Sequence, residues 1–94
     1  MEKEYQQKIE AVTMALTFAF DEFAKNHNGK YPEFSENKGE AITQLNEFIS
    51  TTDRKFPRFR ISISDQGLAY AKVLQIALEI IAQNKQNEEN NTNG

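Results

Sequence analysis

The first helical run, from Tyr5 to about Lys25, constrains the fold most, because it is apolar on more than one face. One stripe recurs at alternating steps of four and three residues, the spacing of one helix face, and consists of Tyr5, Ile9, Val12, Leu16, Ala19 and Phe23. A second stripe lies beside it and consists of Ala11, Met14, Ala15, Phe18 and Phe20. Such a wide apolar surface needs several other elements to cover it, so we expect this helix at the centre of the domain.

Length and composition indicate one folded domain. A chain of 94 residues has room for a single modest core. With 38% hydrophobic and 27% charged residues and a net charge of −3, the composition is typical of a globular protein. The absence of cysteine excludes a disulfide framework, a thiolate nucleophile and a cysteine-bound zinc.

The sequence predicts a cytoplasmic protein with no membrane segment. The N-terminus, Met1 to Tyr5, is acidic where a signal peptide would be basic and then apolar. The most apolar later run, Leu68 to Ala82, is interrupted by charged residues and is too short to span a bilayer.

Local signals mark the end of the first helix and the start of the second. The first helix should stop at Asn26 to Gly29, because Asn and Gly tolerate the left-handed conformation that closes a helix. After a connector whose aromatic residues should fold back onto the core, Asn37 and Glu40 have the spacing of a capping box, with Ser35 as a competing cap. The second helix is predicted to be amphipathic, about three turns long, and to end near Thr51.

Positive charge is concentrated in residues 54–60, which we call the basic arm. The arm contains four of the 11 basic residues of the chain and none of its 14 acidic residues. Its candidate partner-binding residues are Arg54, Lys55, Phe56, Arg58 and Arg60. Positive charge is therefore concentrated in this segment, apart from the acidic residues of the chain.

The pattern after Pro57 predicts a short β-strand over residues 59–64. Phe59, Ile61 and Ile63 alternate with Arg58, Arg60, Ser62 and Ser64. Pro57 suits an edge strand or its first residues. The strand needs a pairing partner, and three remain open: the segment from Tyr31 to Phe34, a hairpin with residues 55–58, or the same strand of a second subunit.

The last predicted helix is capped by Ser64 or Asp65, has Gly67 in its first turn and ends near Gln83. Two of the three helices carry apolar faces wider than one contact needs, so we expect a homodimer. The polar residues 84–94 are expected to be a disordered tail. The predicted fold is mainly α in residues 1–83, with three helices and one short β element, α+β at most.

Residues 59–71 resemble the last strand and following helix of winged-helix domains. The resemblance lies in Phe59-Arg60-Ile61-Ser62-Ile63-Ser64, followed by polar residues, Gly67 and an alanine-rich helix start. It implies a DNA-binding regulator in which residues 54–60 form the wing that contacts phosphates. The rest of the chain departs from the family pattern, because no helix-turn-helix is evident upstream.

No catalytic, cofactor-binding or metal-ligating residues are predicted. His27, the only histidine, lies in the Asn-Gly turn, where a capping or exposed role is expected. The adjacent Asp21 and Glu22 point about 100° apart on a helix, a poor arrangement for a carboxylate pair. The chain has no phosphate loop, dinucleotide fingerprint or histidine pair, and no small-molecule substrate is evident.

The basic arm leaves three interpretations open. It can be a protected strand edge, a nucleic-acid contact, or a surface that docks onto an acidic protein. We expect a non-enzymatic regulatory or inhibitory protein that binds another protein. The alternative is a winged-helix-like DNA-binding regulator that uses the same arm.

Overall fold

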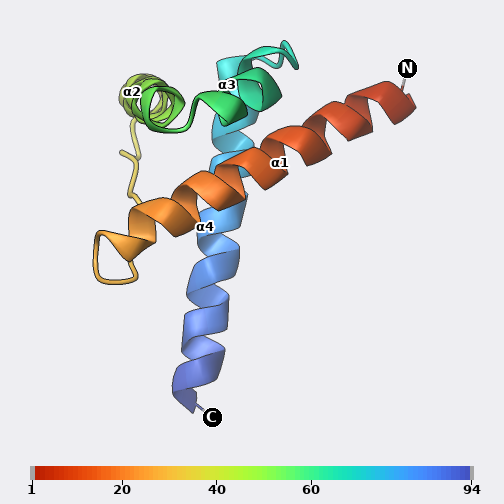
Figure 1. Ribbon diagram of the computed structural model, residues 1–94. Helices are drawn as coiled ribbons and strands as arrows, with labels where there is room; N and C mark the ends of the chain where they lie inside the picture. Colours follow the sequence, from red (N-terminus) through yellow and green to blue (C-terminus); the bar gives the residue numbers. More distant parts are fainter. Residues whose placement is uncertain (1, 94) are drawn as a thin grey trace.

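The chain folds into four α-helices in the part that the structure describes. The computed structural model describes residues 2–93, except for the side chains of residues 59–62 and 87–93. Its elements are α1 (Glu2–Lys25), α2 (Lys38–Lys55), α3 (Pro57–Ser64) and α4 (Tyr70–Asn93) (Figure 1). The mainly α fold is confirmed. The expected β element is wrong, because no residue within this range forms a strand.

Helix α1 is central only along its second half. It packs against α3 and α4, and Figure 1 shows α4 crossing it while its N-terminal turns project beyond the other helices. Residues 2–8 are all exposed. The buried side chains of α1 are Val12, Ala15, Leu16, Ala19 and Phe20. The wide apolar surface predicted from the sequence is therefore covered where the other elements reach it, while Tyr5 and Met14 stay exposed.

One core joins all four helices. From α2 it receives Ala41, Leu45 and Ile49, from α3 Ile63, and from α4 Val73, Leu74, Ile76, Ala77 and Ile81. Tyr31 and Phe34, in the connector between α1 and α2, pack against this core as expected.

The predicted stop of α1 is confirmed at the turn of residues 26–29. Asn28 has φ 57° and Gly29 has φ 80°, the left-handed conformation that glycine adopts without steric cost. The Gly29 backbone N–H donates to the Ala24 carbonyl at 2.8 Å and so satisfies one of the last carbonyls of the helix.

Asn37 caps α2 as the sequence predicts. Its side-chain Oδ1 accepts a hydrogen bond from the Glu40 backbone N–H at 3.0 Å. Ser35 does not cap the helix. Its Oγ accepts from the Asn37 backbone N–H at 3.1 Å, the donor that the Glu40 side chain would occupy in a complete capping box. The helix is longer than expected and ends at Lys55.

Replacing Asn37 by alanine removes this cap. The change should lower the free energy of unfolding by about 0.5–2 kcal/mol, because the Glu40 N–H loses its partner. Chemical denaturation followed by circular dichroism measures the loss. Lys38→Ala, an exposed change at the next residue, is the control. Equal stability of N37A and the wild type would show that water replaces the cap without cost.

Residues 57–64 form helix α3 instead of the predicted strand. Pro57 suits the first position of a helix, where its missing N–H is not needed. A helix satisfies its own backbone, whereas a lone strand would have needed a partner. Ile63 is buried, and α3 packs against both α1 and α2. The strand of the winged-helix resemblance is thus replaced by a helix, and none of the three pairing partners is needed.

Helix α4 also differs from its prediction at both ends. Ser64 ends α3, Gly67 lies in the loop with φ 67°, and α4 begins at Tyr70. The backbone N–H groups of Lys72 and Val73 donate to the Ala69 carbonyl at 3.0 Å. The helix continues to Asn93, beyond the expected end near Gln83. Disorder of residues 84–94 stays a prediction, and the side chains of 87–93 lie outside the described part.

Candidate functional site

The basic arm forms the corner between α2 and α3. Arg54 and Lys55 are in the last turn of α2, and Arg58 is in the first turn of α3; all three are exposed. The backbone of Arg60 belongs to α3, but its side chain lies outside the described residues. The structure therefore brings the predicted site together on a helical corner, not along a strand.

Phe56 fixes this corner to the rest of the domain. It is the C-cap residue of α2, and its backbone N–H donates to the Thr52 carbonyl at 2.7 Å. Its half-buried ring packs edge-on against Phe18 of α1, with the ring centroids 5.6 Å apart. The positive charges are thus held at a defined position relative to α1.

A groove of about 550 Å³ lies between α1 and α2 and reaches the basic arm at Lys55 and Phe56. The helices α1 and α2 meet through aromatic side chains more than through close backbone packing. The Phe48 ring lies 5.2 Å from that of Phe20 and 5.9 Å from that of Phe23. The groove is lined by Ala19, Glu22, Phe23, Asn26, His27, Pro32, Glu33, Phe34, Gln44, Glu47, Phe48, Thr51, Thr52, Lys55 and Phe56.

The two ends of the groove can be told apart by their ring contacts. At one end Phe18 meets Phe56, next to Lys55. At the other end Phe23 meets Phe48, where α1 approaches its C-terminus. The connector lies along this second end, because the Ser35 backbone N–H donates to Gln44 Oε1 at 2.8 Å.

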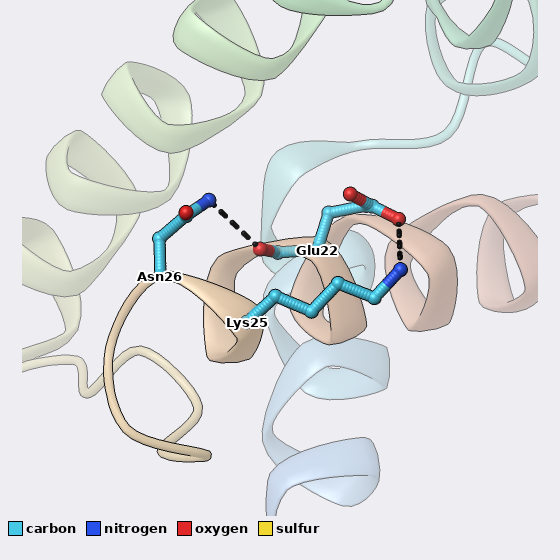
Figure 2. Close-up of polar contacts among 3 residues, drawn as sticks. All are labelled: Glu22, Lys25 and Asn26. Atoms are coloured by element: carbon cyan, nitrogen blue, oxygen red, sulfur yellow. Dashed lines mark hydrogen bonds and ion pairs between the residues drawn. The ribbon is translucent and has the colours of Figure 1, made fainter.

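The second end carries carboxylates. Glu22 forms an ion pair with Lys25 at 2.9 Å, and the Asn26 side-chain amide donates to the Glu22 carbonyl at 3.3 Å (Figure 2). Glu33 and Glu47 also line the groove and are exposed. The groove is therefore polarised, with the carboxylates of Glu33 and Glu47 at this end and Lys55 at the other.

His27 closes α1 at the rim of the groove. Its Nδ1 lies 2.8 Å from the Phe23 carbonyl oxygen. Its ring stacks on that of Phe23, with the centroids 3.7 Å apart and an interplanar angle of 3°. His27 is exposed and contacts a carbonyl of the last turn, so the expected capping or exposed role is confirmed, and its ring extends the aromatic surface.

A smaller groove of about 380 Å³ lies between α1 and α4. The hydroxyls of Thr13 and Thr17 face it but donate to the carbonyls of Ile9 and Thr13 in their own helix, each at 2.7 Å. Because these hydroxyl groups already donate within α1, this groove offers a partner fewer contacts than the aromatic groove does.

The described residues contain no group of three or more His, Cys, Asp or Glu side chains that could hold a metal ion. None of their helices combines the length and the apolar character needed to cross a membrane.

Comparisons with family models, curated proteins and solved structures find no match to this chain. The assignment of the candidate site therefore depends on the geometry of this chain alone.

The basic arm was predicted from the sequence, whereas the groove beside it was not. The groove residues that were not predicted are Phe23, Phe34 and Phe48, whose rings were expected on ordinary apolar faces or in the connector. The sequence shows that the chain has seven phenylalanines, but not that several of them line one surface. Among those whose side chains are described, only Phe20 is fully buried, and the others are half-buried.

Proposed function

We propose that this chain is a small regulatory or inhibitory protein that acts by binding another protein through its basic arm. The observation that carries the proposal is the position of the arm. Three exposed basic side chains stand on a corner that Phe56 anchors to α1, at the mouth of an aromatic groove. Phenylalanine and arginine are among the residue types enriched in protein interfaces.

The test reverses the charge of the arm. In the variant Arg54→Glu, Lys55→Glu and Arg58→Glu, attraction to an acidic partner becomes repulsion, so capture of the partner should fall about tenfold or more. The fold should persist, because all three side chains are exposed. A small stability loss of about 0.3–1 kcal/mol is expected for each change in the last turn of α2, where the helix dipole favours cations.

A matched control places the same charge change elsewhere. Lys3→Glu, Lys8→Glu and Lys85→Glu alter three exposed lysines of α1 and α4 and give the same net charge. Each immobilised protein is incubated with nuclease-treated extract of the source organism, and bound proteins are quantified by mass spectrometry. A partner retained by the wild type and the control, but not by the arm variant, supports the proposal. Equal capture by all three proteins contradicts it.

DNA binding through the same arm is the alternative, favoured by its clustered exposed cations. Contact with two to four phosphates would make the affinity for duplex DNA fall with salt, with a log–log slope of about −2 to −4. Retention on a DNA column with this salt dependence, lost in the arm variant, would favour the alternative.

Self-association is also part of the proposal. The described large apolar side chains that remain exposed are Tyr5, Met14, Tyr70 and Leu78, on α1 and α4. Light scattering at tens of micromolar protein tests the expected homodimer, and a monomer mass would remove it.

A further inference from the structure

The aromatic groove has the size and apolar lining of a binding site. Its volume of about 550 Å³ falls in the range of about 300–1,000 Å³ typical of pockets for small molecules and cofactors. Four phenylalanine rings line it, those of Phe23, Phe34, Phe48 and Phe56, and each is half-buried, so part of each ring stays available for contact.

The neighbouring elements favour a helical occupant. The described residues contain no strand, so they offer no sheet edge to which an extended peptide could add. The walls of the groove are α1, α2 and the connector between them. An amphipathic helix packs on a helical wall by placing side chains spaced i, i+3, i+4 and i+7 between its ridges.

The charges along the groove define the orientation that a bound segment would take. Lys55 lines one end, whereas Glu47 and Glu33 line the other. Glu47 and Lys55 are eight residues apart in α2, which corresponds to about 12 Å along the helix axis, or two turns. A complementary segment therefore carries acidic residues at one end, apolar residues over two turns and basic residues at the other end.

We infer that the groove binds an amphipathic helix of a partner protein, with its apolar face on the phenylalanine rings and its acidic residues at Lys55. Because carboxylates are favoured at helix N-termini, the bound helix runs antiparallel to α2. The inference rests on the proposed function and specifies its partner, since it adds the groove to the basic arm.

A random peptide library displayed on phage tests this occupant with the intact chain as bait. The expected enriched peptides place Asp or Glu before apolar residues at helical spacing and Lys or Arg after them. Two bait variants locate the binding. Thr51→Trp puts a large ring into the groove at an exposed lining position, and Ser50→Trp puts the same ring on α2 outside the groove. Both proteins are first checked by circular dichroism for the wild-type helical content.

Synthetic copies of the enriched peptides should bind Thr51→Trp about tenfold or more weakly than the wild type, and Ser50→Trp with unchanged affinity. Lys55→Glu should weaken the same peptides to a similar extent. No enrichment, enrichment of the reversed charge order, or equal binding by Thr51→Trp and Ser50→Trp overturns the inference. If the enriched peptides bind Lys55→Glu more weakly but bind Thr51→Trp as well as the wild type, the groove inference is wrong and the proposed function still stands. If the arm variant captures the partner from the extract as well as the wild type does, the proposed function itself is wrong.

Discussion

Replacing Phe20 by alanine should lower the free energy of unfolding by about 3–5 kcal/mol, a large share of the stability of a small domain. The Phe20 side chain is 0% exposed. Its ring lies between those of Tyr31, Phe34 and Phe48, at centroid distances of 5.6, 6.5 and 5.2 Å. Alanine would leave a cavity where α1, the connector and α2 meet, so all three would lose packing. Urea unfolding followed by circular dichroism measures the change.

The control for this prediction is Phe23→Ala, three residues further along the same helix. The Phe23 ring is half-buried and contacts Phe48 and His27 at the surface of the groove. Its loss should cost clearly less stability than that of Phe20. If both variants unfold at the same urea concentration, the ring of Phe20 is not the central contact between these elements.

Leu16→Ala is expected to cost about 2–5 kcal/mol, because this side chain is also 0% exposed and belongs to the core shared with the other helices. Met14→Ala on the same helix removes the same number of side-chain heavy atoms as Leu16→Ala, but from a side chain that is 74% exposed. That change should stay within about 0.5 kcal/mol of the wild type. Thermal and urea unfolding of the pair measure the contrast. A large loss in Met14→Ala would show that Met14 is covered in solution, as in a dimer through α1.

The parts of the fold that were predictable depend on local signals. The Asn28-Gly29 turn and the Asn37 cap are set by the conformations and hydrogen bonds of the residues themselves, so their positions follow from the sequence. The central place of the second half of α1 follows from the width of its apolar surface, whereas the exposure of its first turns does not.

Helix α3 was misassigned because eight residues hold little periodicity. Phe59 and Ile63 fit an alternating strand and also the four-residue step of a helix. Pro57 is equally acceptable at the start of either element. The choice was decided by packing, since a helix here buries Ile63 without needing a strand partner.

The groove could not be predicted because it depends on contacts between distant residues. The connector is held by the Tyr31 hydroxyl, which donates to Asp21, and by Ser35, whose N–H donates to Gln44. These bonds and the ring of Phe48 set the separation of α1 and α2. The composition revealed only that the rings exist, not that they line one surface.

The measurement that tests the central claim most directly is a map of backbone amide chemical shifts in ¹⁵N-labelled protein as the captured partner is added. If the basic arm and the groove form one binding surface, the largest changes should fall on Phe48, Thr51, Lys55 and Phe56, with little change around Leu78 on the exposed face of α4. Changes centred on Leu78 or on Tyr5, with α2 unaffected, would contradict the account.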